Sequence, residues 1–419
     1  MEKHFDLIVA GAGWAGSAAA IAAGRKGLRV LIIDKNNCPG GAAASCLVMP
    51  FMRFWTLDPV TEEKHFLARG IFEELGKKLE ACGAMPDQRK FNEEYVKLFL
   101  EEMLLDAGVT LLYESYLVGA KTEGGRVTGV TVANKSGLTE FTADYFIDGT
   151  GDGDLCVMAG CHARLGRESD SLCQPMSLMF RMCNVDTDLF MQEKPAIQEK
   201  YKEYQAAGKI TNCRENVLTF LTPIPGIVHF NTTRVVKLNP VNGEDVTRAN
   251  IEARRQIFEL IAMLKENFES FKNAELMTSA LQMGVRESRM IDGDYILTQE
   301  DLLALRRFDD SIAVCNYDID IHNPEGTGTS HHYFAPGEYY TIPYRCLTPL
   351  GKDNLWVAGR CISSTHEAQA SYRIMPICCT IGQAAGTAAA LACKGKCTSR
   401  QISIPELQKD LEAQNLRIR

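Results

Sequence analysis

Residues 5–34 read FDLIVAGAGWAGSAAAIAAGRKGLRVLIID, a stretch rich in glycine and alanine and almost without charge. Residues 7–24 carry no ionisable side chain, which suits a secretory segment, a membrane span or the start of a nucleotide-binding fold. Gly11, Gly13 and Gly16 form G-x-G-x-x-G directly after the first apolar run, and a secretory or spanning helix has no need of glycines at fixed offsets. The spacing therefore favours the nucleotide-binding fold.

Each of these glycines has its own role in a strand–turn–helix unit. Gly11 permits the tight turn, Gly13 lets the backbone approach a pyrophosphate, and Gly16 lets the helix pack closely on the strand. The phosphates then bind free N–H groups at the helix N-terminus. A second apolar run, LRVLIID, predicts a buried strand ending at Asp34, whose carboxylate is placed to accept hydrogen bonds from a ribose. Together these features predict a dinucleotide site rather than secretion or membrane insertion.

The composition narrows the class of protein. The chain has 419 residues, 46% of them hydrophobic, which suits one large or two ordinary globular domains. A formal net charge of −8 argues against nucleic acid as the main partner, because phosphate binding requires a basic surface. The 15 cysteines include no C-x-x-C pair, and we recognise no signal peptide, so we expect a cytoplasmic protein with mostly buried, apolar cysteines. The adjacent His331 and His332 do not have metal-ligand spacing, so we expect no metal site.

The order of predicted elements indicates a divided domain. Two helices are expected at residues 61–83 and 91–108, followed by a strand, a small meander and a further buried strand. The sequence pattern then changes to mixed strands, loops and a long charged helix from about 246 to 272. After this segment, NLWVAGR predicts another buried strand. We therefore expect a split nucleotide-binding domain, residues 1–170 and 341–419, with a substrate domain, residues 171–340, inserted into it.

Several later motifs give the chain a resemblance to a known family. They are the doublet Gly40-Gly41, DYFIDGTGDGDL (144–155), GVRESRMIDGDYILTQEDL (284–302), IPYRCLTP (342–349) and NLWVAGRCISSTHEAQASYRIMPICCTIGQAAGTAAALA (354–392). With the N-terminal fingerprint, nearly the whole chain resembles the FAD-dependent oxidoreductases of glutathione-reductase-type fold, a family related to the flavin subunit of heterodisulfide reductase. The resemblance implies an α/β protein: a Rossmann-like FAD-binding domain with an inserted α+β substrate domain, and FAD as the cofactor. It does not specify a substrate.

The resemblance also implies which residues contact FAD. The ADP half is assigned to Gly11, Gly13, Ala15, Gly16, Asp34 and Lys35, and the adenine to the backbone of Leu117. The pyrophosphate, ribityl chain and flavin are assigned to Gly41, Ala42, Thr150, Gly151, Asp152, Gly359 and the residues around Met375. Many relatives have an acid after the C-terminal strand where this chain has Arg360, so the polar contact to the ribityl chain is expected to differ.

The segment near the C-terminus supports a flavin independently of the resemblance. Pro376 suits the first turn of a helix, which is expected to start at about residue 377 and to direct free N–H groups at whatever lies in front of it. A reduced flavin carries negative charge near N1, which such a helix end stabilises. The alternative is a core helix that packs through Gly382 and Gly386 and has no role at the flavin.

The motifs that are missing bear on the electron partner. The sequence has no second G-x-G-x-x-G between a strand and a helix and no cysteine cluster for iron–sulfur centres. We therefore expect a small-molecule substrate and an external electron donor or acceptor, with no nucleic acid and no membrane insertion.

Flavin chemistry needs a positioned substrate and one proton carrier. The candidates fall in four groups: Arg53; Arg286, Glu287 and Arg289; His322, His331 and His332; and Tyr344, Arg345, His366 and Arg373. His366 is closest in sequence to the expected flavin face, and histidine shuttles protons near neutral pH. Tyr344 and His322 are the alternatives to it.

Two interpretations are open for each main candidate. His366 either carries the substrate proton or forms hydrogen bonds within its own loop. Arg286 and Arg289 either bind substrate or pair with a carboxylate such as Asp292 or Glu287, and PFMRFW (50–55) is either a substrate wall or a buried loop. The favoured function is hydride transfer between bound flavin and a small polar organic substrate; the alternative is an RNA-modifying or non-catalytic binding protein built on the same fold.

Overall fold

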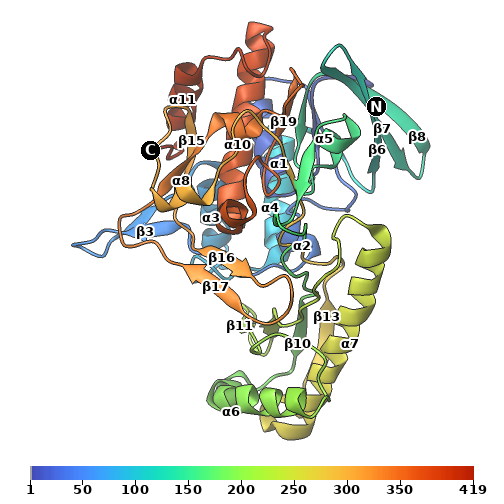
Figure 1. The fold of residues 1–419 in the computed structure, drawn as a ribbon, viewed down its shortest axis with the longest axis vertical. Coiled ribbons are helices and arrows are strands. Elements are labelled where there is room, and N and C mark those ends of the chain that lie inside the picture. The colour runs from blue at the N-terminus through green and yellow to red at the C-terminus, as the bar shows by residue number, and fades with distance from the viewer. Residues whose placement is uncertain (1) are drawn as a thin grey trace.

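The structure is a computed structural model that describes residues 2–419. One large sheet organises the N- and C-terminal parts of the chain, in the strand order β5-β2-β1-β8-β7-β6, with β19 also paired to β8 (Figure 1). Because a strand has two edges, β7 and β19 share the edge of β8 opposite β1. The strands of this sheet are β1 (His4–Ala10), β2 (Val30–Ile33), β5 (Thr110–Leu112), β6 (Tyr116–Glu123), β7 (Arg126–Asn134), β8 (Gly137–Asp148) and β19 (Leu355–Val357).

The parallel part of the sheet has its carboxyl ends level. Ala10 lies opposite both Ile33 and Asp148, and Asp148 lies opposite Val357. The short strands are buried along their length, as expected for a parallel sheet covered on both faces. Ligands of such sheets bind outside the carboxyl ends of the strands. The α/β, Rossmann-like architecture expected from the sequence is confirmed.

Two helices pack together on the sheet, α1 (Trp14–Arg25) and α10 (Met375–Gly395). A Cβ at Gly382 would lie 2.0 Å from the carbonyl oxygen of Ala15, and a Cβ at Gly386 would lie 2.1 Å from that of Ala19. Only glycine allows this approach, so the small residues of α10 are a requirement of its packing on α1. The other helices of this body are α2 (Ala42–Ser45), α3 (Ile71–Ala81), α4 (Glu93–Asp106), α5 (Asp154–Met158), α8 (Gln299–Leu303), α9 (His366–Tyr372), α11 (Ile404–Ala413) and the 3₁₀ turn η2 (Tyr344–Leu347).

A second body lies below the first in Figure 1 and has its own hydrophobic core. It is built on an antiparallel sheet in the order β11-β12-β10-β13, covered by two long helices. We call it the cap. Its elements are β10 (Phe180–Cys183), α6 (Thr187–Ala206), β11 (Thr219–Leu221), β12 (Val228–Phe230), α7 (Gly243–Asn267), η1 (Glu269–Phe271) and β13 (Glu275–Ser279).

Four two-stranded sheets complete the structure. The hairpin β16–β17 lies between the two bodies (Figure 1). Buried residues from 291 to 342 pack with the core of the large sheet, whereas those from 176 to 283 form the core of the cap. The boundaries of the inserted domain stay a prediction. The small sheets are β3 (Trp55–Leu57) with β4 (Lys64–Phe66), β9 (Ala163–Leu165) with β14 (Arg289–Ile291), β15 (Ser311–Cys315) with β18 (Tyr340–Pro343), and β16 (Ile319–His322) with β17 (Thr329–His332).

Two predicted helices have different bounds in the structure. The helix expected at 61–83 begins only at Ile71, because Gly70 adopts φ +64 and the residues before it include strand β4. The long charged helix starts at Gly243, capped by the side chain of Asn242, and ends at Asn267 rather than at 272. The helix expected at 91–108 is confirmed as α4.

Within residues 2–419, α10 is the one helix whose length and apolar composition would suit a membrane span. However, 89% of its most apolar window is buried inside the protein. Its apolar surface is therefore used by the core.

Candidate active site

The turn between β1 and α1 forms a cradle at the carboxyl edge of the sheet. Gly11 adopts φ +90, and a Cβ there would lie 2.5 Å from the carbonyl oxygen of Gly149. At Gly16 a Cβ would lie 1.8 Å from the carbonyl oxygen of Gly11, so this glycine lets the helix meet the strand. At Gly13 the nearest atoms to a Cβ are 3.9 Å away, so its surface is left open for a ligand to approach the backbone.

The first turn of α1 offers free donors at this cradle. Among residues 2–419, no acceptor takes the N–H groups of Trp14 or Ala15. Gly13, which precedes the helix, has no side chain to cap it. An uncapped helix N-terminus beside an open glycine is suited to bind phosphate.

Asp34 follows β2 and holds the turn in place. Its Oδ2 accepts the N–H of Ala12 at 2.5 Å, and its Oδ1 accepts the N–H of Asn36 at 2.7 Å. Burial raises the pKa of this carboxyl, against the two backbone N–H bonds that lower it. A carboxylate has about four lone-pair sites, so acceptor capacity remains for a ribose. The ribose contact stays a prediction.

The glycine doublet packs directly on the phosphate turn. Gly41 adopts φ +46, and a Cβ there would lie 2.8 Å from the Cα of Gly13. Ala42 then starts α2. Lys35 is exposed beside the cradle, and Leu117 is half-buried on β6, paired with Val132.

A partly buried ion pair closes the cradle on the side of β8. The Arg360 guanidinium donates to Asp152 Oδ1 at 2.9 Å, and the Ser288 hydroxyl donates to the same oxygen at 2.6 Å. Against burial, which would raise it, Arg360 and Ser288 hold the pKa of the Asp152 carboxyl below its usual value. The second terminal nitrogen of Arg360, Nη1, is buried and has no partner among residues 2–419. This nitrogen is thus a free cationic donor. It belongs to Arg360, the residue that stands where many relatives have an acid.

The other residues expected at the cofactor border this cradle. Thr150 donates from both N–H and hydroxyl to Asp148, at 3.0 and 2.7 Å, and Gly151 (φ +83) packs on Arg360. Gly359 adopts φ +95, and a Cβ there would lie 3.1 Å from that of Ala15. Met375 begins α10, whose N-terminus has no side-chain cap.

A histidine–glutamate pair joins the start of α9 to the segment 284–289. His366 opens α9, and its Nδ1 lies 2.6 Å from Glu287 Oε1. Glu287 has no exposed surface, and its Oε2 accepts the N–H of Gln174 at 2.8 Å. A carboxylate that engages Nδ1 leaves Nε2 of the same ring as the face that can exchange a proton.

Arg286 and His322 belong to a second polar network, next to this pair. The Gln174 side chain is part of this network: its Oε1 accepts the N–H of His322 at 3.2 Å and faces Arg373 Nη2 at 3.4 Å. The Arg286 guanidinium donates to the carbonyl of Pro175 and the hydroxyl of Ser177, both at 2.7 Å.

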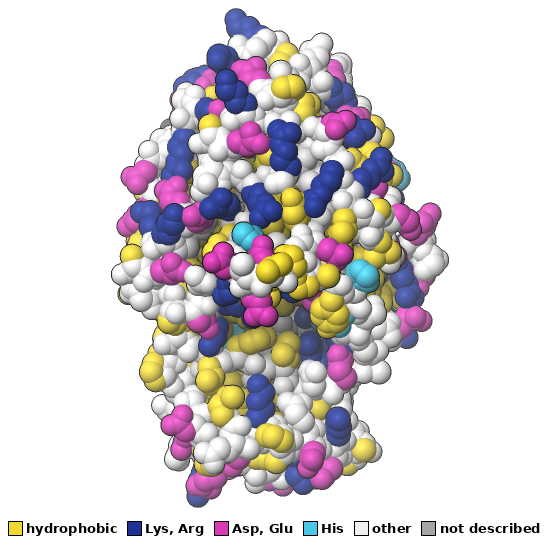
Figure 2. Space-filling view, turned by 90° about the vertical axis from the view of Figure 1, so that its left-hand side faces the viewer, with side chains coloured by type: hydrophobic (Ala, Val, Ile, Leu, Met, Phe, Trp, Pro, Cys, Tyr) yellow, Lys and Arg dark blue, Asp and Glu magenta, His cyan; other side chains and the backbone are white. Residues whose placement is uncertain are grey.

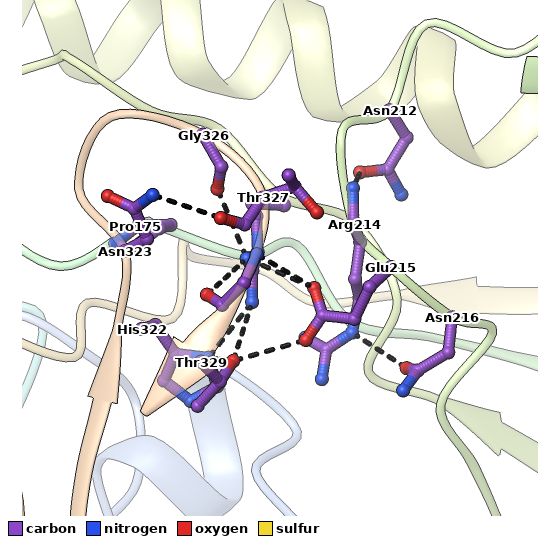
Figure 3. A network of polar contacts seen from close by, with 12 residues as sticks. Pro175, Asn212, Arg214, Glu215, Asn216, His322, Asn323, Gly326, Thr327 and Thr329 are labelled. Atoms are coloured by element: carbon purple, nitrogen blue, oxygen red, sulfur yellow. Dashed lines mark hydrogen bonds and ion pairs between the residues drawn. The ribbon is translucent and has the colours of Figure 1, made fainter. Parts of the chain in front are cut away.

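Part of this network is shown in Figure 3, where Glu215 and His322 meet at Thr329. Arg234 donates to His322 Nδ1 at 3.0 Å, which leaves Nε2 to face Asp320 Oδ2 at 3.4 Å. Burial and the Arg286 charge lower the pKa of His322 to about 3, so the imidazole is neutral at neutral pH.

Comparison with known proteins shows the family to which the chain belongs. A model of FAD-dependent oxidoreductases matches residues 6–411. The chain belongs to this family. It is therefore an FAD-dependent oxidoreductase with FAD as cofactor, and the open glycine, the free helix N–H groups and the free Arg360 nitrogen fit the phosphates of that cofactor.

Similar proteins give the family a context. A digeranylgeranylglycerophospholipid reductase of Picrophilus torridus is 27% identical over 207 residues, which cover 45% of this chain and 49% of the relative. Protein FixC of Bradyrhizobium diazoefficiens is 27% identical over 179 residues, 39% of this chain and 41% of the relative. The chain thus matches half or less of the length of these relatives. They do not point to heterodisulfide reductase, so the assignment stands at the level of the family.

Solved structures resemble the chain over nearly its whole length. A geranylgeranyl bacteriochlorophyll reductase-like protein from Thermoplasma acidophilum has a TM-score of 0.48 and 12% identity, over 98% of this chain and 83% of that one. The flavin-dependent brominase Bmp2 has a TM-score of 0.49 and 12% identity, over 98% and 84%.

Two further predicted catalytic residues of this oxidoreductase are held by other protein groups. The Tyr344 hydroxyl accepts from Trp356 Nε1 at 2.7 Å and donates to the carbonyl of Ser399 at 2.6 Å, and burial raises its pKa far above the usual value. Arg289 pairs with Asp154 at 2.8 Å, not with the carboxylates expected from the sequence. These contacts favour a structural role for both residues.

Sequence reasoning missed several residues of the second network. Arg214 and Arg234 lie in the middle third of the chain, where no motif singled them out, and Asp320 lies two residues before the candidate His322. Glu287 was considered as a partner for arginine, whereas the structure pairs it with His366, 79 residues away. One signal in the sequence could have found the two arginines. Both lie in segments that otherwise have the pattern of strands or loops, where a charged side chain needs a partner.

Proposed function

We propose that this oxidoreductase transfers a hydride between FAD and a small polar organic substrate that binds between the carboxyl edge of the sheet and the cap. The observation that carries the proposal is the buried pair His366–Glu287. Glu287 follows Arg286 in sequence, and His366 opens α9, six residues after Arg360. Bound FAD supplies the two-electron chemistry. An external donor or acceptor balances the electrons.

The protein residues supply binding and proton movement. For a substrate being oxidised, the hydride leaves carbon, and the proton of the neighbouring O–H or N–H goes to Nε2 of His366. Glu287 holds the ring through Nδ1 and offsets the positive charge that the ring then carries. The free N–H groups at the start of α10 and its dipole favour negative charge on the reduced cofactor.

The direct test is an anaerobic screen. Purified protein containing FAD is mixed with a metabolite panel of alcohols, amines, hydroxy acids and amino acids, and the flavin absorbance is followed. Bleaching by at least one small substrate is the expected result, and the reverse reaction is tested with chemically reduced enzyme. If no small molecule exchanges electrons with the flavin, but transfer RNA binds tightly at physiological salt, the RNA-modifying alternative replaces this proposal.

A further inference from the structure

Two buried and two partly buried arginines gather between the cap and the β16–β17 hairpin. We call Arg214, Arg234, Arg286 and Arg373 the arginine cluster. Contacts link the four residues: Arg234 donates to His322, whose backbone N–H bonds the Gln174 oxygen that Arg373 also reaches. Arg286 reaches Asn231, and the carbonyl of the adjacent Thr232 accepts from Asn212, which also bonds the backbone N–H of Arg214. In line with these contacts, burial and the charges of the other three arginines lower the pKa of Arg286 well below its usual value. The molecule is hollowed between its two bodies on the face shown in Figure 2, with basic, acidic, histidine and apolar side chains around the hollow.

Two of the four arginines have carboxylate partners. Arg234, whose side chain is 1% exposed, lies 3.2 Å from Glu215. Arg373 lies 3.4 Å from Asp320, a carboxylate that also faces His322 and His331 at 3.4 and 3.6 Å. These contacts occupy the two carboxylates of the network.

Arg214 and Arg286 form hydrogen bonds only with neutral groups among residues 2–419, although the nearby charges of Glu215 and Asp320 raise the pKa of Arg214 and of Arg286, respectively, against the larger effect of burial. Arg214 is 4% exposed; its Nε donates to Asn216 Oδ1 at 3.3 Å, and its Nη1 is buried with no partner. Figure 3 shows its side chain reaching past Glu215 toward Asn216. Arg286 donates to one carbonyl, one hydroxyl and, at 3.3 Å, the amide oxygen of Asn231.

Such an arrangement is unfavourable without a counter-charge. Buried charges in proteins are normally paired, and an unpaired one is strongly destabilising. Burial and the neighbouring Arg234 charge lower the pKa of Arg214 as well, yet guanidinium groups keep their proton in proteins. An anion from outside the chain would supply the charge that the described carboxylates do not.

The cluster also borders the place where the reactive half of FAD is expected. Gly284, two residues before Arg286, is packed so that a Cβ would lie 4.0 Å from that of Cys46, which follows α2. The carbonyl of Arg286 accepts from Gln369 Nε2 of α9 at 2.9 Å. Arg373 ends α9, two residues before α10 begins at Met375. Arg286 thus connects the cap with α9, and Arg373 lies between the end of α9 and the start of α10, next to the β16–β17 hairpin.

We propose that Arg214 and Arg286 bind an oxyanionic group of the substrate, so that this enzyme acts on small organic anions. The inference rests on the proposed function, because it specifies the substrate class of the same site. The guanidinium fork matches the oxygen pairs of carboxylate and of phosphoryl groups, and both belong to the class named here. Asn231 and Ser177 supply neutral donors and acceptors at its edge.

The test measures binding without turnover. The FAD-containing wild-type enzyme is titrated at constant ionic strength with acetate, succinate, benzoate and inorganic phosphate, and the flavin spectrum and Tm are followed. We expect saturable binding of at least one anion, and the carboxylate and phosphate series tell which group is bound. Arg214→Gln is expected to weaken that binding by about 10- to 100-fold, as for the loss of a hydrogen bond between charged groups.

A second readout separates binding from a structural role. If Arg214 awaits an anion, Arg214→Gln removes an unpaired buried charge, and its Tm without anion stays level or rises. A structural arginine gives a lower Tm and no change in anion affinity. Arg248→Gln, an exposed arginine on α7, is the charge-matched control.

The failure of this inference differs from the failure of the proposed function. If no anion perturbs the wild-type flavin or raises Tm, while neutral molecules bleach it, the anion site is rejected and the function stands. If anions bind and no small molecule exchanges electrons, the function is rejected and the site stands. The wild-type titration decides even if an arginine variant does not fold.

Discussion

A buried carboxylate dictates what the histidine beside it can do. Glu287 has no exposed surface and receives one hydrogen bond from His366 and one from the backbone N–H of Gln174. Loss of the histidine donor would leave a buried charge supported by one neutral donor, which is costly. The same contact fixes the ring of His366 and leaves Nε2 free of Glu287. The pair therefore suits proton transfer, and any test must separate that role from support of Glu287.

His366→Gln tests the proton role. Glutamine keeps a donor for Glu287 but cannot carry a proton, so we expect FAD to remain bound and flavin reduction to slow by roughly 10²- to 10⁴-fold. Stopped-flow reduction per FAD-loaded molecule and a melting curve measure the two effects separately. His162→Gln, an exposed histidine paired with Asp292, is the control. A full rate in His366→Gln together with a lower Tm would assign the pair to stability alone.

His229 gives a prediction on pH. It is fully buried on β12, both ring nitrogens lack a partner among residues 2–419, and burial and the Arg181 charge lower its pKa to about 3. The folded state therefore needs the neutral ring, whereas the unfolded chain protonates it below about pH 6.5. The stability from this residue is complete above pH 6.5 and is lost toward pH 3, at roughly 1.4 kcal/mol per pH unit.

The comparison variant for this effect is His229→Leu. Denaturant unfolding from pH 7 to pH 5 should show a shallower loss of stability in the variant than in the wild type. His65→Leu, at an exposed position on β4, should keep the wild-type slope. Equal slopes for wild type and His229→Leu would contradict the lowered pKa.

At the scale of elements, the contact between α1 and α10 aligns the two helix ends at the cofactor. Gly382→Ala places a methyl group against the backbone carbonyl of Ala15, which cannot move without displacing α1. We expect a loss of stability of about 1–3 kcal/mol and weaker FAD binding, measured by denaturation and by flavin release. Gly76→Ala on α3 meets only the end of Met85 at 3.6 Å and should be neutral or stabilising by up to about 1 kcal/mol. Equal effects of the two variants would show that the close approach is not needed.

Elements with strong local signals could be predicted from the sequence. The β1–α1–β2 unit was predictable because Gly11, Gly13 and Gly16 each meet a local geometric need, and α10 because an apolar run follows a proline. The start of α3 could not be predicted, because the sequence before Gly70 has helix-forming residues. Only the φ of +64 at Gly70 shows that the helix does not extend further toward the N-terminus. The packing of α10 through Gly382 and Gly386 is confirmed, whereas the role of its uncapped N-terminus at the flavin stays a prediction.

At the scale of the whole molecule, contacts between distant residues limit what the sequence can show. His366 and Glu287 meet across 79 positions, and Arg360 reaches Asp152 across 208. The segment Arg286–Arg289 has side chains with four destinations: the cap, His366, Asp152 and Asp154. Its motif was recognisable, but the partners are set by how the cap folds over the sheet. Arg286 and Arg373 were candidates from the sequence, but their neighbours Arg214 and Arg234 could not be predicted, for the same reason.

The two bodies are also joined by a buried ion pair. Arg181 on β10 of the cap donates to both oxygens of Glu93 at the start of α4, at 2.6 and 2.7 Å, and the side chains are 7% and 8% exposed. Breaking a buried pair leaves one charge uncompensated, so Arg181→Met should destabilise the protein by about 3–5 kcal/mol. It should also raise the pKa of His229, which the Arg181 charge helps to lower.

A double-mutant cycle tests whether this pair holds the bodies together or only offsets its own burial. Glu93→Leu with Arg181→Met removes both charges, and apolar replacements of buried pairs are often neutral or stabilising. We therefore expect the double variant to recover most of the stability lost by Arg181→Met, measured by denaturant unfolding. Limited proteolysis reports the docking of the cap, because an undocked cap exposes the segments that join it to the sheet. If the double variant is as unstable as the single one and is cleaved at those segments, the geometry of the bidentate pair itself docks the cap.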